Sequence, residues 1–218
     1  YRIIGVFNNQ VKLVKWDYAK SSLLGTDGDF SQEYSYYFSG EQGESPSSNS
    51  LYSWNKTTST NTWSTSKLNT VNLNTNFVNN IGETWSNKIA TTIWKVGGGT
   101  TTYIYNSVPK TTYQYELGTN ASTTTYSAQI GLMYVTDYYY SASPSAWTLV
   151  GYNSSDATKD YRLMKEENWL YGGGNDWSIS RSSDYSSFAF FVYNTGFIYN
   201  NDVSTGISVD LHFTLTQI

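Results

Sequence analysis

Apolar and polar residues alternate most regularly near the carboxyl end of the chain. Polar residues separate the apolar residues Ile207, Val209, Leu211, Phe213 and Leu215. A period of two is typical of a β-strand with one buried face. The pattern therefore predicts one long strand, on whose polar face His212 is solvated or hydrogen-bonded.

The amino-terminal segment has the pattern of a β-hairpin. Residues 2–7 and 11–16 are rich in β-forming side chains, and Asn8-Asn9-Gln10 between them is a turn signal. Both ends of the chain are thus predicted strands, and we expect them to pair in one sheet.

A helical period follows between residues 64 and 82. Apolar or β-branched residues recur there at steps of three or four, namely Leu68, Val71, Thr75, Val78 and Ile81. A second, short helix is predicted from Glu83 to about Trp94, before the glycine run 97–99. The preceding residues 25–62 have a loop-like composition.

The carboxyl-terminal half has the pattern of strands and loops. Residues 128–135 are apolar enough for a central strand, and residues 144–165 read as a loop with one helical turn. Residues 188–193 and 197–203 flank Asn194-Thr195-Gly196, which predicts a second hairpin. The fold class expected is α+β, with small antiparallel sheets, two helices and many loops in one domain over residues 1–218.

Composition excludes several kinds of chemistry. The chain has no Cys and one His among 218 residues, so it has no disulfide, no thiol nucleophile, and neither a Cys-ligated nor a multi-histidine metal site. A net charge of −4 gives no general attraction to nucleic acid or anionic lipid. No apolar run is long enough to span a bilayer. We expect no cofactor, no bound metal and no transmembrane segment.

Catalytic candidates are few, and each has a simpler structural interpretation. His212 has no spacing signal for a Ser-His-Asp triad, and the adjacent Glu166 and Glu167 are poorly placed to act on one glycosidic bond. Asp27-x-Asp29 lacks the remaining ligands of a calcium-binding loop. The glycine runs 97–99 and 172–174 lack the Lys-Ser/Thr of a phosphate loop. The sequence therefore favours a protein that is not an enzyme.

Polar and aromatic residues concentrate between Asn175 and Gly206. Tyr, Ser, Asn and Asp interrupt an apolar pattern there that includes Phe188, Phe190, Val192 and Phe197. Tyrosine supplies contact area at low rotamer entropy, and Ser and Asn supply adaptable hydrogen bonds. This mixture is typical of a recognition surface on an apolar framework, although an ordinary Ser- and Tyr-rich hairpin has the same composition.

Several segments together resemble a known group of proteins. They are residues 2–7 with 11–14, Trp85-Ser86-Asn87-Lys88-Ile89-Ala90, residues 130–138, Asn168-Trp169-Leu170-Tyr171 and Trp177-Ser178-Ile179-Ser180-Arg181. Their order and spacing resemble bacterial surface proteins that are often pilin-like at the amino terminus. The carboxyl-terminal region is similar to the C-type-lectin-fold variable proteins of diversity-generating retroelements.

The resemblance implies a C-type-lectin-like fold with a scaffold over about residues 1–170 and a variable ligand-binding region over about 171–210. In that family, adenine-directed mutation diversifies exposed positions. Together with Trp177, the matching positions here are Ser182, Ser183, Asp184, Tyr185, Ser186, Ser187, Tyr193, Tyr199, Asn200, Asn201, Asp202, Ser204 and Thr205. Gly206-Ile207-Ser208-Val209-Asp210 replaces the family's Gly-Val-Arg-Pro, which changes the local anchor of the last strand.

Three functions are compatible with these observations. The first is a non-enzymatic, adhesin-type module on a bacterial cell surface, which binds a protein or glycan of another cell or phage. The second is a structural subunit that self-assembles into a surface filament, for which low charge permits close packing. The third is a carbohydrate-binding module or hydrolase, suggested by 8 Trp and 21 Tyr, although most of these aromatic residues fit core positions.

Overall fold

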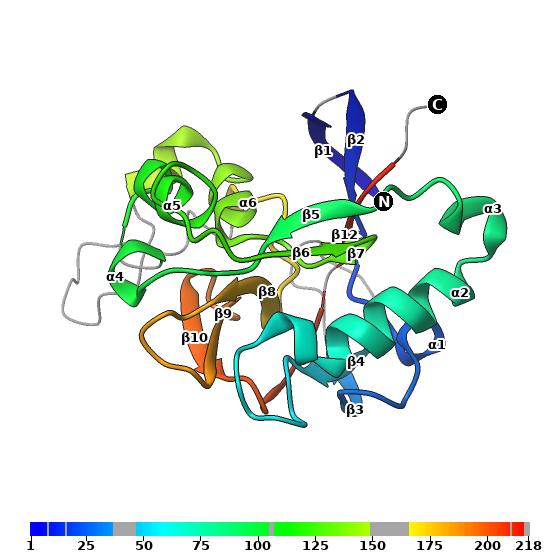
Figure 1. Cartoon of the computed structure of the whole chain (residues 1–218). Coiled ribbons are helices and arrows are strands. Elements are labelled where there is room, and N and C mark those ends of the chain that lie inside the picture. The colour runs from blue at the N-terminus through cyan, green and yellow to red at the C-terminus, as the bar shows by residue number, and fades with distance from the viewer. Residues whose placement is uncertain are drawn as a thin grey trace.

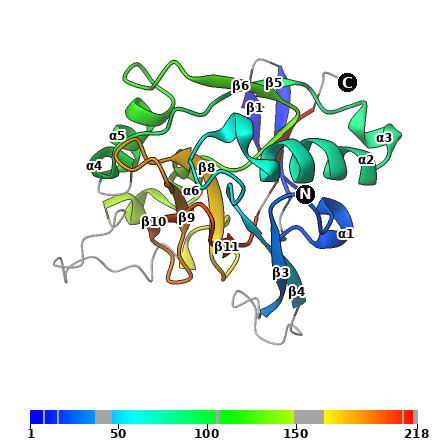
Figure 2. The ribbon, with the colours of Figure 1, turned by 60° about the horizontal axis from the view of Figure 1, so that its bottom comes forward.

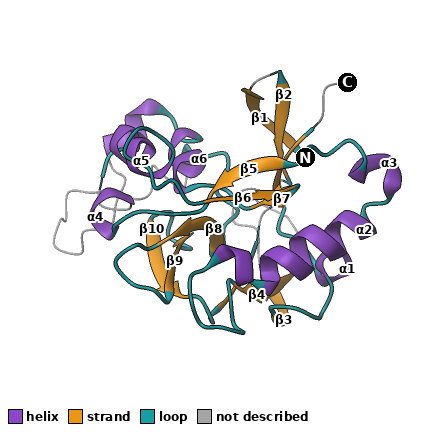
Figure 3. Cartoon of the chain, in the orientation of Figure 1, coloured by secondary structure: helices purple, strands orange, loops and turns teal. Residues whose placement is uncertain are grey.

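Four small antiparallel sheets and a set of short helices make up the described part of the chain (Figure 1). The computed structural model describes residues 1–7, 9–15, 17–36, 47–104, 107–148, 166–209 and 211–215. The class is therefore mixed α+β, as expected, and much of the chain runs in loops between short elements (Figure 3).

The terminal strands belong to one four-stranded sheet. Its order is β1 (Arg2–Phe7), β2 (Gln10–Val14), β12 (His212–Thr214) and β7 (Ile130–Gly131). The predicted amino-terminal hairpin is confirmed. The two ends of the chain share a sheet, as expected, but β2 lies between β1 and β12, so the terminal strands do not pair directly with each other.

A second sheet occupies a region that the sequence predicts to be loop. It contains β3 (Phe30–Tyr36), β4 (Ser47–Ser53) and β11 (Gly206–Ile207), with β4 in the centre (Figure 2). The prediction was wrong because β4 is polar and lacks apolar alternation, so its pairing on both edges outweighs its weak β-propensity. Residues 37–46 of the expected loop lie outside the described residues.

The predicted second helix begins at Glu83 as expected, but its predicted extent to about Trp94 is wrong. Helix α3 covers only Glu83–Ser86, and β5 (Thr92–Lys95) instead pairs with β6 (Thr125–Ala128). The β-branched residues Thr92 and Ile93 fit a strand better than a helix. Residues 128–135, expected to be one strand, contain the end of β6, the short β7 and the first residue of helix α6 (Val135–Tyr140).

The predicted helix over 64–82 is confirmed, but its buried face differs from the expected one. A 3₁₀ turn, η1 (Trp63–Thr65), precedes the π-helix η2 (Leu68–Phe77) and one turn of α-helix, α2 (Val78–Asn80). The wider π turn shifts the positions that share a face. The residues buried along η2 are Leu68, Asn69, Asn72, Leu73 and Phe77.

The remaining helices are short. They are α1 (Ser21–Leu24), α4 (Thr101–Ile104), α5 (Pro109–Glu116) and the 3₁₀ helix η3 (Pro144–Thr148). The helical turn expected within 144–165 is thus confirmed, while residues 149–165 lie outside the described part. Among the described residues, no helix has the length and apolar character needed to cross a bilayer.

The third sheet contains β8 (Asp176–Arg181), β9 (Phe188–Val192) and β10 (Ile198–Asp202), in the order β10-β9-β8. The predicted hairpin of β9 and β10 is confirmed, with uninterrupted register. Alternate residues of β9 enter two different apolar clusters: Ala189 and Phe191 join Trp177 in one, and Phe190 and Val192 join Ile198 in the other. This sheet therefore separates the two cores of the molecule.

The long carboxyl-terminal strand is interrupted, and its polar face is not solvated. Strand pairing is confined to β11 and β12, and Ser208 and Leu215 form isolated bridges with Asp176 and Ile89. Ser208 is 4% exposed and His212 is fully buried. The expectation of a solvated or hydrogen-bonded His212 was wrong because both faces of this segment are covered by distant parts of the chain.

Candidate functional site

Three aromatic side chains gather where β9 and β10 meet. Tyr199 lies opposite Phe191 in the strand register, and their ring centroids are 6.1 Å apart. Phe197 lies between Tyr193 (5.2 Å) and Tyr199 (6.2 Å). Tyr199 is 37% exposed, whereas Phe191 is buried against Trp177. We call Tyr193, Phe197 and Tyr199 the aromatic patch; sequence reasoning had assigned Phe197 to the scaffold.

The turn between β8 and β9 is held by an asparagine that sequence reasoning missed. Nδ2 of Asn61, a buried side chain, lies 2.7–2.8 Å from the carbonyl oxygens of Ser182, Tyr185 and Phe188. Its Oδ1 accepts a hydrogen bond from Arg181 at 3.1 Å. Residues 183–186 are exposed on this fixed turn. No local pattern around Asn61 identifies it, because all these partners are more than one hundred positions away in the sequence.

Several candidate polar residues are engaged within the scaffold. Oδ2 of Asp184 accepts hydrogen bonds from the Thr101 amide (2.7 Å) and hydroxyl (3.0 Å). Oδ1 of Asp202 accepts hydrogen bonds from the Ser204 amide (2.9 Å) and hydroxyl (2.6 Å). These side chains shape the backbone, which leaves less of their hydrogen-bonding capacity for a ligand.

Two candidates lie in the interior. Trp177 is fully buried and donates from Nε1 to the Tyr52 carbonyl at 2.9 Å. Ser182 is fully buried, and its hydroxyl accepts hydrogen bonds from the amides of Asp184 and Tyr185, each at 3.2 Å. Their assignment to an exposed surface is corrected accordingly: they support the turn and the sheet.

The exposed candidates form two groups. Tyr199 and Asn201 lie on the Phe191 face of the sheet, while Asn200 and Asp202 alternate onto the opposite face. At the other end of the strands, Tyr185 contacts Phe188 with a centroid distance of 5.4 Å. Ser183, Tyr185 and Ser186 are exposed on the turn, and the half-buried Ser187 and Thr205 lie at the same end of the sheet. Along β10 and at the opposite end, Tyr199 is exposed, whereas Tyr193, Asn200 and Asn201 are half-buried.

The glycine run 97–99 lies against the candidate turn. The Gly99 amide donates to the Arg181 carbonyl (3.2 Å), and the Ser183 amide donates to the Gly99 carbonyl (2.9 Å). Gly98 has φ 61°, and a Cβ there would lie 1.8 Å from the Arg181 oxygen. Glycine is required at this position because the two backbones approach so closely.

Gly98→Ala is therefore expected to reduce the free energy of unfolding by more than the about 1–2 kcal/mol of a left-handed alanine. Gly82→Ala is the matched control, because Gly82 also has a positive φ (81°) but a Cβ there meets nothing within 4 Å. Denaturant titration of both variants measures the difference. Equal losses would show that the backbones do not approach as described.

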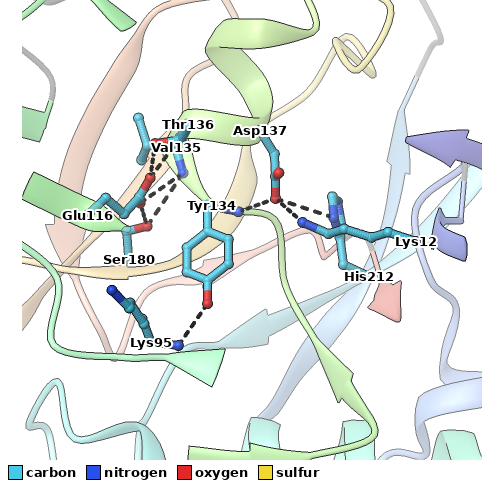
Figure 4. A network of polar contacts seen from close by, with 9 residues as sticks. All are labelled: Lys12, Lys95, Glu116, Tyr134, Val135, Thr136, Asp137, Ser180 and His212. Carbon is cyan, nitrogen blue, oxygen red and sulfur yellow. Dashed lines mark hydrogen bonds and ion pairs between the residues drawn. The ribbon is translucent and has the colours of Figure 1, made fainter. Parts of the chain in front are cut away.

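A network of polar side chains lies at the start of α6 (Figure 4). Lys12 Nζ contacts Asp137 Oδ2 at 2.7 Å, and His212 Nδ1 lies 3.7 Å from the same oxygen. The Tyr134 amide also donates to this oxygen, at 3.0 Å. Burial by itself would raise the pKa of Asp137, but attraction to Lys12 and His212 and these hydrogen bonds outweigh it, so that the pKa is lowered.

On the other side of the same turn, Glu116 is a buried carboxylate with uncharged donors. The amides of Val135 (3.1 Å) and Thr136 (2.8 Å) donate to it, as do the hydroxyls of Thr136 and Ser180. Burial raises the pKa of Glu116, and these hydrogen bonds partly offset that effect. Glu116 thus joins α5 to α6, because it accepts hydrogen bonds from amides at the amino terminus of α6 that have no partner within the helix.

The network does not form a Ser-His-Asp triad around His212. The ring is fully buried, and neither ring nitrogen has a hydrogen-bond partner among the described residues. Burial and then the Lys12 charge lower the pKa of His212 to about 3, while Asp137 opposes this shift. A neutral, inaccessible imidazole without a hydroxyl partner cannot activate a nucleophile, so this network is a structural one.

The other acidic candidates have structural partners. Oε2 of Glu167 accepts hydrogen bonds from the hydroxyls of Ser143 and Ser145. Asp29 is fully buried and accepts hydrogen bonds from the amides of Lys56 and Leu68, so it joins the loop to η2. The described ranges hold no cluster of three or more His, Cys, Asp or Glu residues that could bind a metal ion.

Comparison with known proteins adds no assignment. No protein-family model, no curated protein and no solved structure matches this chain. Its function is therefore inferred from its own side chains, and the strongest candidate is the aromatic patch, with the exposed turn 183–186 at the other end of β9.

Proposed function

We propose that this chain is a non-enzymatic, adhesin-type binding module displayed on a bacterial cell surface, and that the aromatic patch contacts a protein ligand. The observation that carries the proposal is the exposure of Tyr199 beside Tyr193 and Phe197 over the buried Phe191. Large aromatic side chains on a rigid support provide contact area at a small cost in conformational entropy.

The position of the patch in its sheet supports a protein ligand. Strand β10 is the last strand of its sheet, and no further strand pairs with it in the described part of the chain. An open strand edge offers backbone donors and acceptors to an extended segment of a partner. Asn200 and Asn201 on the same strand add side-chain amides beside the patch.

We extend the proposal to a C-type-lectin-like fold with a diversified carboxyl-terminal surface. The small antiparallel sheets, the shared sheet of the terminal strands and the exposed turn on a doubly packed sheet support it. Variation would act at Ser183, Tyr185, Ser186, Tyr199 and Asn201, whose side chains are not fully buried. A neighbouring reverse-transcriptase gene with a template repeat that differs at adenines would test this extension.

Replacing Tyr199 and Tyr193 by Ala is expected to reduce binding at least tenfold, because each removes an aromatic anchor. Fluorescently labelled chain would be titrated against a panel of bacterial cells and phage particles, with and without protease treatment. Protease treatment should abolish binding by the unchanged chain. The control is Tyr140→Ala, since Tyr140 is 42% exposed, close to the 37% of Tyr199, but lies on α6.

Thermal unfolding of each variant distinguishes the outcomes. We expect melting temperatures close to that of the unchanged chain, because the patch rings are partly exposed. Binding that Tyr199→Ala leaves unchanged, or binding that survives protease, would contradict a protein ligand at this patch.

A second candidate function, a subunit of a surface filament, is favoured by apolar exposure at the opposite part of the fold. Ile3 and Val6 on the edge strand β1 are each 66% exposed, and Ile93 on β5 is 70% exposed. Such an edge can pair with another copy of the chain. Sedimentation over a range of concentrations separates this candidate from a monomeric binding module.

A further inference from the structure

A pocket lies on the sheet of β3, β4 and β11, and its far wall includes Asn194, which follows Tyr193 of the aromatic patch in the chain. Its volume is about 470 Å³, within the range of small-molecule sites. The sheet side includes Tyr34, Asn49, Leu51 and Ser208, and the opposite side includes Gly173, Gly174, Asn175 and Asn194. Figure 2 shows β3 and β4 near β11, in keeping with the pairing of both β3 and β11 with β4.

One side chain in this pocket has an unused hydrogen-bond acceptor. Asn49 is 1% exposed, and its Nδ2 donates to the Ser208 hydroxyl. Its Oδ1 is buried without a partner among the described residues. Buried polar atoms in folded proteins are nearly always hydrogen-bonded, and Asn49 lines the pocket, so a bound ligand would supply the donor that Oδ1 lacks.

An exposed aromatic ring lies next to this acceptor. Tyr34 is directly opposite Asn49 in the register of β3 and β4, so both side chains lie on the same face of the sheet. Tyr34 is 50% exposed. Its ring can cover one face of a ligand whose other groups reach Oδ1 of Asn49.

The residues that the structure describes around the pocket are uncharged. Amides, hydroxyls, backbone and apolar groups line it, and none of its described lining residues is Asp, Glu, Lys, Arg or His. A phosphate or carboxylate would lose its hydration without gaining a cation, and an amine would gain no carboxylate. A neutral ligand with several hydroxyl groups meets neither cost.

We propose that this pocket binds a neutral saccharide unit, with a sugar hydroxyl donating to Asn49 Oδ1 and the C–H face of the ring stacked on Tyr34. A hydroxyl group both donates and accepts, so neighbouring hydroxyls of the same sugar can reach the amides of Asn175 and Asn194. The lining of this pocket includes no residue of the aromatic patch, and the proposal does not depend on the function proposed for the patch.

The test is calorimetric titration of the full chain with neutral mono- and disaccharides, alongside glucuronate as an acidic sugar. We expect at least one neutral saccharide to bind and glucuronate to bind at least tenfold more weakly. Tyr34→Ala is expected to reduce the affinity for the neutral saccharide at least tenfold. Asn49→Ala should do the same, with circular dichroism to check folding, because Asn49 also contacts Ser208.

Tyr199→Ala is the matched control, since it alters an exposed tyrosine on the other site and should leave saccharide affinity unchanged. If only Tyr199→Ala reduces the affinity for the saccharide, the sugar binds the aromatic patch and the pocket proposal is wrong. Saccharide binding that is insensitive to Tyr34→Ala also overturns the proposal. So does the absence of binding by every neutral saccharide at concentrations of about 10 mM, which would reveal a Kd in the millimolar range. The latter result would mean that the pocket holds water only.

Discussion

Lys12→Met is expected to lower the free energy of unfolding by about 3 kcal/mol, the low end of the range for removing one partner of a buried ion pair. Lys12 and Asp137 each retain 13% side-chain exposure, which places the effect at that end. The variant leaves the Asp137 carboxylate without its cation while its hydrogen bond from the Tyr134 amide remains. Urea titration at pH 7 measures the loss.

Two controls define this result. Lys56→Met removes an exposed lysine and is expected to change stability by less than about 0.5 kcal/mol. Adding Asp137→Asn to Lys12→Met removes the unpaired charge and should recover part of the loss. A loss below about 1 kcal/mol for Lys12→Met would show that the pair behaves as a surface salt bridge.

Acidification from pH 7 to pH 4 is expected to destabilise the folded chain by about 3 kcal/mol through His212 alone. Burial lowers the folded-state pKa of His212 to about 3, from an ordinary value of 6.5. Between these two values the unfolded chain binds a proton that the folded chain does not bind. Stability is therefore complete above about pH 6.5, falls as the pH drops, and stops falling below about pH 3.

His212→Leu isolates this effect. Neither ring nitrogen has a hydrogen bond to lose among the described residues, so an apolar side chain of similar size is tolerated at pH 7. From pH 7 to pH 4 the unchanged protein should lose about 3 kcal/mol of unfolding free energy relative to the variant. Parallel stability curves over this range would mean that His212 titrates normally and is not buried as described.

The charge of Lys12 and the protonation of His212 are coupled. The charge of Lys12 disfavours protonated His212, whereas Asp137 favours it. In Lys12→Met, His212 should therefore take up its proton at a higher pH, and the acid destabilisation that it causes should become smaller.

Local sequence pattern predicted the elements whose stability comes from neighbours in the chain. The hairpins around Asn9 and Asn194-Thr195-Gly196 follow from turn residues between β-forming segments, and both are observed. The helix after Ser66 follows from its apolar recurrence, although a π turn moved the buried face. Pattern failed for β4, a polar strand that pairs on one edge with the preceding strand β3 and on the other with the distant strand β11.

The sequence likewise predicted only part of the candidate site. Composition drew attention to Tyr193, Tyr199 and the turn after Ser182, and these do lie on one small sheet. Composition could not separate Trp177, which is buried, from the exposed tyrosines, because residue type alone does not determine which face of a strand is covered.

By itself, then, the sequence determined the chemistry that this protein lacks, such as thiol or multi-histidine sites, and the approximate position of its polar and aromatic segment. The tertiary structure alone decided that His212 is buried beside Asp137, that Asn61 holds a turn more than one hundred residues away, and that Asn49 and Tyr34 face one pocket. The reason is physical: alternation specifies two faces of a strand, but segments distant in the chain determine which face meets solvent.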